Sequence, residues 1–441
     1  GDFTNNSANF TNVTFVIVDG TLTINPKAVT ISTGGGEKEY DGSALTNATV
    51  GIEGLVDGES VTLTATGSQT EVGISDNTYD IEWDNAKESN YTVTDNLGEL
   101  KVTTSAAEVI LTAPSDSKIY DGTALTKTTG VTWTGLPADF TVEATASGSQ
   151  TDAGSSANVV NDGYVIKDAG GNNKTANFTD ITKVPGTLKV TPKPVTISTG
   201  GGEKEYDGIA LTNAIVGIEG LVDGESVTLA ASGSQTEVGS SANTYSITWD
   251  NAKAANYTVT NNLGTLTVTK NAAAVVLTAP SDSKTYDGTA LTKTTGVTWT
   301  GLPAGFTVEA TASGSQTDAG SSDNVVDDGY VIKDADDNDK TANFTNVTTE
   351  KGTLTVNPKA VTITTGSDSK AYDGTALTNS TVGIEGLVDG ESVTLAASGS
   401  QTEVGSSANT YSITWDNAKA ANYTVTNNLG TLTVTKNAAA V

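Results

Sequence analysis

The 441-residue chain contains no cysteine, methionine or histidine, and all 23 of its basic residues are lysine. Without cysteine there is no disulfide framework, no thiolate nucleophile and no cysteine-bound metal. Without histidine the commonest acid-base catalyst and metal ligand near neutral pH is missing as well. These absences exclude most familiar catalytic sites, so we expect a protein that is not an enzyme and that needs no cofactor.

Positive charge is also scarce. The 23 lysines stand against 52 acidic residues, which gives a formal net charge of -29 and a pI near 4.1. Nucleic-acid binding depends on clustered basic residues, whereas these lysines are scattered singly along the chain. No stretch reaches the roughly 18 consecutive apolar residues that a membrane-spanning helix needs. The sequence therefore predicts no nucleic-acid partner and no membrane insertion in this segment.

The main feature that is present is an internal repeat. The tripeptide Tyr-Asp-Gly occurs five times, and its tyrosines are alternately 80 and 86 residues apart. Two module types, A and B, therefore alternate in a super-repeat of 166 residues. The A copies are Tyr40-Asp41-Gly42, Tyr206-Asp207-Gly208 and Tyr372-Asp373-Gly374, and the B copies are Tyr120-Asp121-Gly122 and Tyr286-Asp287-Gly288.

Turns and closing strands shared by the two types set the expected module boundaries. The modules are expected at residues 26–104 (A1), 105–191 (B1), 192–270 (A2), 271–357 (B2) and 358–436 (A3). Residues 1–25 match the C-terminal part of a B module, and residues 437–441 match the start of a further one. The links between modules are short, and proline stiffens those from B to A, so we expect a semi-rigid string.

Alternation of apolar and polar residues dominates each module, as in "SVTLTAT" at 60–66 and "TYDIEW" at 78–83. Period two with Val, Ile, Thr, Tyr and Trp is typical of half-buried strands. About seven or eight such strands in roughly 80 residues predict an all-β fold, a tandem and elongated array of small Ig-like β-sandwich modules. The alternative is a β-grasp-like module, which requires a crossover helix. Its best candidate is the segment 83–90.

The Tyr-Asp-Gly tripeptide itself is predicted to be a structural turn. Tyr40 ends a strand with its ring available to the core. Asp41 can accept a hydrogen bond from a backbone N–H two residues on, and Gly42 supplies a positive φ at little steric cost. This interpretation is favoured over a catalytic Tyr-Asp pair.

Several of these segments together resemble a known family. Tyr-Asp-Gly followed by Thr/Ser-Ala-Leu-Thr, then "GLVDGESV", "NYTVT" and "GTLTVNPKAVTI", is similar to the YDG-type and MBG-type repeat modules of large bacterial cell-surface adhesins. The resemblance covers essentially the whole chain. It implies secreted, extracellular arrays at the cell surface that hold an adhesive tip away from the envelope, and it implies no enzymatic activity.

Three functions remain open at this stage. The first is a structural stalk or spacer segment of a secreted bacterial surface protein, whose partners are neighbouring modules of the same longer chain. The second is a set of modules that bind host or matrix glycans through exposed aromatic rings. The third is a subunit of an extracellular filament that other copies extend by strand addition, an idea motivated by the incomplete modules at both ends of the sequence.

Two candidate sites for other chemistry are weighed against simpler interpretations. Asp334, Asp336 and Asn338 alternate as in the first half of a calcium loop. The distal Glu and the loop glycine are missing, and the equivalent segment 167–174 has lost most of the acids, so a solvated acidic loop is expected.

The second candidate is a covalent cross-link. Lys38 lies two residues before Tyr40 and shares its strand face, which is a costly place for an unpaired ammonium group. An isopeptide bond to an asparagine such as Asn90 would neutralise it. The simpler interpretation is that the stem of Lys38 packs beside the ring while its head reaches solvent or Glu39.

Overall fold

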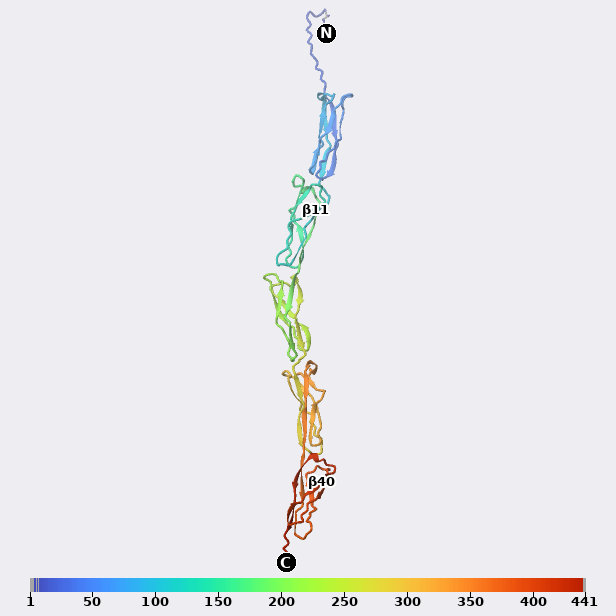
Figure 1. The fold of residues 1–441 in the computed structure, drawn as a ribbon. Helices are drawn as coiled ribbons and strands as arrows, with labels where there is room; N and C mark the ends of the chain where they lie inside the picture. The colour runs from blue at the N-terminus through green and yellow to red at the C-terminus, as the bar shows by residue number, and fades with distance from the viewer. Residues whose placement is uncertain (1–3, 5, 7, 439–441) are drawn as a thin grey trace. The chain divides into compact units, whose positions relative to one another are not determined.

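The structure is a computed structural model that describes residues 4, 6 and 8–438. It divides into two compact units. Unit 1 comprises Gly1–Val195, Gly220–Ser226 and Trp249–Val259, and unit 2 comprises Thr196–Glu219, Val227–Thr248 and Thr260–Val441. The colours of Figure 1 show that the strands of each module come from one continuous stretch of the chain. The described residues before Lys27 form no strand, and residues 439–441 of the expected last module lie outside the described residues.

Modules A1 and B1 lie in unit 1. The A1 elements are β1 (Lys27–Thr33), β2 (Gly36–Glu39), β3 (Val50–Glu53), β4 (Thr62–Ala65), β5 (Gly73–Asp76), β6 (Tyr79–Glu82), the 3-10 turn η1 (Glu88–Asn90), β7 (Tyr91–Asn96) and β8 (Glu99–Thr103). The B1 elements are β9 (Val109–Thr112), β10 (Asp116–Ile119), β11 (Thr132–Thr134), β12 (Thr141–Glu143), β13 (Ala146–Ser147), β14 (Gly154–Val160), β15 (Val165–Lys167), η2 (Thr175–Asn177), β16 (Ile181–Val184) and β17 (Gly186–Thr191).

The segment of A2 is shared between the two units. Its elements are β18 (Lys193–Thr199), β19 (Gly202–Glu205), β20 (Val216–Glu219), β21 (Val227–Ala231), β22 (Gly239–Ala242), β23 (Tyr245–Trp249), η3 (Ala254–Asn256), β24 (Tyr257–Asn262) and β25 (Thr265–Thr269).

Modules B2 and A3 lie in unit 2. The B2 elements are β26 (Val275–Thr278), β27 (Asp282–Thr285), β28 (Thr298–Thr300), β29 (Thr307–Glu309), β30 (Ala312–Ser313), β31 (Gly320–Val326), β32 (Val331–Lys333), η4 (Thr341–Asn343), β33 (Val347–Glu350) and β34 (Gly352–Asn357). The A3 elements are β35 (Lys359–Thr365), β36 (Asp368–Ala371), β37 (Val382–Glu385), β38 (Val393–Ala397), β39 (Gly405–Ala408), β40 (Tyr411–Trp415), η5 (Ala420–Asn422), β41 (Tyr423–Asn428) and β42 (Thr431–Thr435).

The first and last strands of each module run side by side. In A1 the sheets have the orders β3-β1-β7, β2-β8-β5 and β4-β6. Strand β1 pairs in parallel with β7 over six residue pairs, and β2 pairs in parallel with β8 over four. B1 repeats this arrangement with β9 beside β16 and β10 beside β17. The opening and closing segments of a module therefore cross together from one sheet to the next.

The core of each module lies between its two larger sheets. Val29 and Ile31 of β1 and Leu100 and Val102 of β8 are no more than 2% exposed, while their chain neighbours point outward. This period of two is the one read from the sequence. The expected all-β array of small sandwich modules is thus confirmed. No α-helix occurs in the described residues, and the segment proposed as a β-grasp crossover forms only the short turn η1.

An asparagine at the same position is buried in every module. Asn77 is fully buried, and its Nδ2 donates to the carbonyls of Gly34 and Asn47, each at 2.9 Å. A Cβ atom on Gly67 would lie 2.4 Å from the Asn77 Cα, so the glycine of the Gly-Ser-Gln-Thr turn is required by this packing. The equivalent buried residues are Asn158, Asn243, Asn324 and Asn409.

Among the described residues, no helix combines the length and the apolar character that crossing a membrane would require.

Candidate functional site: the junctions between modules

The Tyr-Asp-Gly turn has the same internal geometry in all five copies. Asp41 Oδ1 accepts the Ser43 N–H at 2.9 Å, and Gly42 has a φ of 81°. Lys38 Nζ donates to Asp41 Oδ1 and to Ser43 Oγ, both at 2.7 Å. The Lys38 hydrogen bond is the largest cause that lowers the pKa of Asp41 to about 2. Lys38 therefore links strand β2 to the turn that follows it.

The structure does not bring Lys38 and Asn90 together. Lys38 is paired with Val102 on the parallel strand β8, whereas Asn90 directly precedes β7. About twelve residues of mostly extended chain, or roughly 40 Å at about 3.3 Å each, separate Asn90 from Val102. The two side chains lie at opposite ends of A1, and the isopeptide hypothesis is corrected accordingly. The head of Lys38 reaches Asp41 and not Glu39.

The tyrosine of an A-type turn packs against the next module. Tyr40 is 2% exposed, and its ring meets those of Phe140 and Phe178 of B1 edge-on, with centroids 6.1 and 5.8 Å apart. A Cβ atom on Gly42 would lie 2.7 Å from Phe140, so the turn glycine also allows this close approach. Tyr40 therefore closes the junction between A1 and B1.

An ion pair supports the same junction. Glu71, in the Gln-Thr-Glu turn of A1, contacts Lys174 Nζ of B1 at 2.5 Å. The Nδ2 of Asn177, at the end of η2, donates to the other oxygen of Glu71 at 3.4 Å. Two polar contacts thus lie beside the buried aromatic cluster.

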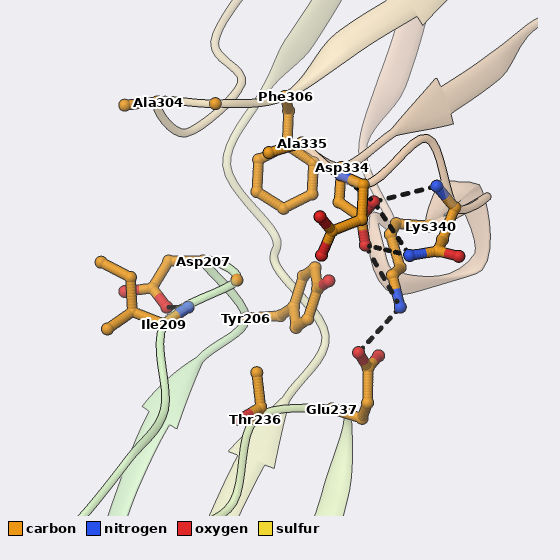
Figure 2. A pocket seen from close by; sticks show the side chains of 14 residues that line it. Tyr206, Asp207, Ile209, Thr236, Glu237, Ala304, Phe306, Asp334, Ala335 and Lys340 are labelled. Atoms are coloured by element: carbon orange, nitrogen blue, oxygen red, sulfur yellow. Dashed lines mark hydrogen bonds and ion pairs between the residues drawn. The ribbon is translucent and has the colours of Figure 1, made fainter.

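The junction between A2 and B2 repeats this geometry within unit 2. Tyr206 is 1% exposed and lies 5.8 Å from Phe306, while Glu237 binds Lys340 at 2.8 Å. Figure 2 shows Lys340 between Glu237 and Asp334, with the ring of Tyr206 beside them. These residues border a cavity of about 340 Å³ that is open to solvent.

The calcium candidate lies at the edge of this cavity. Asp334 Oδ1 accepts the N–H groups of Asp336 and Asn338 at 3.0 and 2.9 Å, and Lys340 lies 3.6 Å from its other oxygen. The carboxylate is therefore used to close its own loop. In the described part of the chain no group of three acidic side chains is placed to hold a metal ion. We do not propose calcium binding here.

The tyrosine of a B-type turn enters a different environment. Tyr120 meets the ring of Tyr257 edge-on at 5.6 Å, and Tyr257 is stacked on Trp249 at 5.6 Å. Glu225 accepts both hydroxyls, with the Tyr120 hydroxyl on Oε1 and the Tyr257 hydroxyl on Oε2 at 2.7 Å. One carboxylate therefore joins a tyrosine from each module. In unit 2, Tyr286, Tyr423 and Glu391 repeat this arrangement.

A second polar contact accompanies each B-to-A junction. Asp152 of B1 accepts from Lys253 Nζ at 2.6 Å and from Asn256 Nδ2 at 2.9 Å. The Ala153 N–H donates to Asn256 Oδ1 at 2.7 Å. Asn256 is 1% exposed because the B1 turn covers it. The polar residues of one module thus recognise the backbone and the side chain of the module before it.

The last turn shows which features depend on a neighbour. Lys370, Asp373 and Thr375 make the same hydrogen bonds as Lys38, Asp41 and Ser43 of A1. Tyr372, however, is 37% exposed, whereas the other four motif tyrosines are at most 5% exposed. The turn is therefore intrinsic to a module, while the burial of its tyrosine comes from the module that follows.

Comparison with known families agrees with this repeat architecture. Residues 25–97, 191–264 and 357–430 each match the family model of the YDG domain, and together they cover half of the chain. The chain belongs to the YDG-domain family. The YDG-type resemblance seen in the sequence is confirmed, and the three YDG matches fall on the three A modules.

Comparison with solved structures adds no further argument about this YDG-domain chain. Drosophila N-cadherin EC1-4 is 12% identical, with 75% of this chain and 99% of that chain covered and a TM-score of 0.20. The N-terminal eight Ig domains of Down Syndrome Cell Adhesion Molecule isoform 1.30.30 are 10% identical, with 92% and 70% covered and a TM-score of 0.18. Neither TM-score is high enough to bear on fold or function. No curated protein matches the chain.

Each module after the first has a surface that contacts the Tyr-Asp-Gly end of the module before it, and we call this surface its receiving side. The sequence analysis missed the receiving sides, although the sequence contains a signal for them. Each carries Lys-x-x-Asn followed by an aromatic residue, and each lies one module after an acidic residue that follows Gln-Thr. The receiving segments are 174–178, 253–257, 340–344 and 419–423, and the acids are Glu71, Asp152, Glu237 and Asp318.

The titration of the tyrosines at the B-to-A junctions follows from their burial and from the carboxylates that they share. The pKa of Tyr257 and of Tyr423 rises to about 12, first because burial disfavours the phenolate and then because of the carboxylate bond. A tyrosine of the unfolded chain titrates near pH 10. Between about pH 10 and 12 the unfolded state therefore binds fewer protons than the folded state. The stability that these tyrosines contribute is complete below pH 10 and is lost as the pH rises through 12.

We expect the substitution Glu391→Gln to lower the pH at which Tyr286 and Tyr423 ionise, because the carboxylate raises the pKa of both. Absorbance of the phenolate during an alkaline titration measures this shift. Glu385→Gln, at an exposed position at the end of β37, removes the same charge away from the junction and should leave the titration unchanged. Identical curves for the two variants would contradict the assigned role of Glu391.

Proposed function

We propose that this repeat-module protein is a tension-bearing, non-enzymatic spacer, a stalk segment of a secreted bacterial surface protein. The observation that carries the proposal is the parallel pairing of the opening and closing strands within a module. The extracellular, adhesin-like setting is the one that the YDG resemblance implies. Because the sequence contains no cysteine, disulfide bonds contribute nothing to its resistance to force, and strand pairing and packing are the sources that the structure offers.

Parallel pairing determines how a pulling force acts on a module. Force enters A1 through β1 and leaves through β8, so the two ends of the module are pulled apart along the strand direction. Six residue pairs between β1 and β7 and four between β2 and β8 then resist together in shear. An antiparallel hairpin pulled at its open end would instead lose its hydrogen bonds one after another. The module topology thus favours resistance to tension.

Short links support the role of a spacer. In unit 1, β17 ends at Thr191 and β18 begins at Lys193, so a single proline separates the last strand of B1 from the next module. The link between A1 and B1 is longer, yet Ala106 N–H donates to Glu39 at 3.2 Å and Ser105 N–H donates to the Asn177 carbonyl. Such links leave little free chain to act as a flexible coil.

The A-module tryptophans do not favour glycan or matrix binding. Trp83, Trp249 and Trp415 are each stacked on a tyrosine of their own A-type segment at 5.5 to 5.6 Å, so their faces are partly covered. In the B modules, Trp133 and Trp299 are 37% and 38% exposed and lie on short strands of their own module.

Stretching single molecules of the full chain tests the proposal. We expect each module to unfold in one step that lengthens the chain by about 24 nm, because some 80 residues extend to about 28 nm at about 3.5 Å each and the folded module already spans about 4 nm. Thr94→Pro removes a donor from β7 and should lower the unfolding force of one module strongly. Thr64→Pro, on the outer strand β4, is the matched control and should lower it less. Unfolding in many small steps, or equal effects of the two prolines, would contradict a tension-bearing role.

A further inference from the structure

The surface of A1 that corresponds to the receiving sides of A2 and A3 holds no Tyr-Asp-Gly turn in the described part of the chain. This surface is defined by Val56, Glu59, Asn90 and Tyr91, and we call it the A1 receiving face. It borders a cavity of about 340 Å³. All of its residues belong to unit 1.

The A1 receiving face carries the same chemistry as the occupied ones. Tyr91 is stacked on Trp83 at 5.6 Å, and its hydroxyl donates to Glu59 Oε2. The same hydroxyl accepts the Val56 N–H at 3.1 Å. In A2 the corresponding Val222 N–H lies 3.0 Å from the Tyr257 hydroxyl. The face is therefore already arranged before any neighbour is bound.

Differences in exposure show what is absent from the face. Asn256 and Asn422 are at most 1% exposed beneath a B-type turn, whereas the equivalent Asn90 is exposed. Val56 is 46% exposed, while its counterpart Val222 is half-buried. In A2 the second oxygen of the shared carboxylate takes the incoming tyrosine hydroxyl. Within the described residues, no hydrogen bond reaches the equivalent Oε1 of Glu59.

We infer that the A1 receiving face is a docking site for the Tyr-Asp-Gly end of a B-type module. The incoming tyrosine stacks edge-on against Tyr91 and donates its hydroxyl to Glu59 Oε1. The incoming Asp-Ala pair, equivalent to Asp152 and Ala153, binds the side-chain amide of Asn90. The equivalent surfaces of A2 and A3 make the asparagine contacts with the preceding B modules, which argues for a B-type module as the occupant.

The side chains of the incoming turn distinguish B-type from A-type ends. In the B-type end of B1, the Asp152 carboxylate binds the side chains of Lys253 and Asn256 on the receiving side of A2. The N–H of the next residue, Ala153, donates to the side-chain oxygen of Asn256. An A-type end offers Glu71 and Val72 at these positions. Its longer acid lies 3.4 Å from the B1 amide and pairs mainly with Lys174. The A1 receiving face is therefore matched to B-type ends.

The test places a B-type module directly before A1 in the full chain. Residues 105–191 are joined to Pro26 in place of residues 1–25, which reproduces the Thr-Pro-Lys link between B1 and A2. Hydrogen exchange is then followed in A1 peptides that contain residues 54–60 and extend to Thr64, where the sequence differs from A2. We expect exchange at these amides to slow by about tenfold, to the rate of the identical residues 220–226.

Two further variants make the result decisive. The same extension with Tyr120→Ala in the added copy should return exchange at residues 54–60 to the rate of the original chain. Asn90→Ala should weaken the protection in the extended chain while leaving exchange in the original chain unchanged. If the added copy does not fold, as two populations of its peptides would reveal, an extension with residues 271–357 replaces it. Unchanged exchange after extension, or protection that survives Tyr120→Ala, would overturn the inference.

Discussion

Replacement of Tyr206 by alanine is expected to destabilise the A2–B2 junction strongly, while the same replacement at Tyr372 has little effect. Tyr206 is 1% exposed and packs against Phe306 and Phe344, whereas Tyr372 is 37% exposed. Truncation of a buried aromatic ring costs about 3–5 kcal/mol in the free energy of unfolding. The cost at the half-exposed position should stay below about 1 kcal/mol.

Denaturant unfolding of the full chain, followed by hydrogen exchange, measures both effects. The Tyr206→Ala variant should speed exchange at the amides around Phe306 and Phe344 and lower the midpoint of the transition that includes them. Tyr206→Phe keeps the ring and should lose much less. Equal losses for Tyr206→Ala and Tyr372→Ala would mean that the tyrosine stabilises its own turn and not the junction.

The sequence indicated which face of its strand the tyrosine of the Tyr-Asp-Gly turn occupies, but not which residues its ring contacts. The alternation around Tyr40 predicted a ring available to the core, because period two distinguishes the two faces of a strand, and in the structure the ring is 2% exposed. The same period says nothing about which module supplies the other side of the contact. Phe140 and Phe178 lie 100 residues or more along the chain, and their approach depends on how the link at residues 104–108 turns.

The cross-link hypothesis failed for a related reason. Lys38 lies near the end of the opening segment of A1, and Asn90 lies at the start of the closing segment. Antiparallel pairing of those segments would have brought the two residues together, whereas the observed parallel pairing holds them apart. Alternating hydrophobicity is the same for parallel and antiparallel strands that bury one face. Strand direction was therefore not available from the pattern.

Composition also gave no sign of the asparagine that is fully buried at the same position of every module. Asn77 lies in the sequence Ser-Asp-Asn-Thr, which by its residue types indicates only a turn between two strands. In the structure it is fully buried and binds two backbone carbonyls that no strand ladder satisfies. A buried side chain whose partners are backbone groups 30 and 43 residues away leaves no periodic signal. Its recurrence in all five modules was the only trace in the sequence.

Substitution of this asparagine by aspartate is expected to unfold A1 more easily than any surface change of the same charge. Asn77→Asp keeps the shape of the side chain but replaces the donor Nδ2 with an oxygen, which faces the carbonyls of Gly34 and Asn47. Two buried acceptors then lose their donor, and a buried carboxylate gains no partner. We expect a loss of more than about 3 kcal/mol in the free energy of unfolding at pH 7.

The pH dependence of this loss tests its cause. Burial raises the pKa of the introduced carboxyl above that of the unfolded chain, so the folded state holds the proton more tightly as the pH falls from 7 toward 4. The protonated group can donate to one carbonyl, and the difference between variant and parent should therefore shrink in that range. Asn96→Asp adds the same charge at an exposed position of β7 and should change stability by less than about 0.5 kcal/mol at either pH. A loss for Asn77→Asp that equals this control, or that does not shrink on acidification, would show that the two carbonyls do not depend on the amide donor.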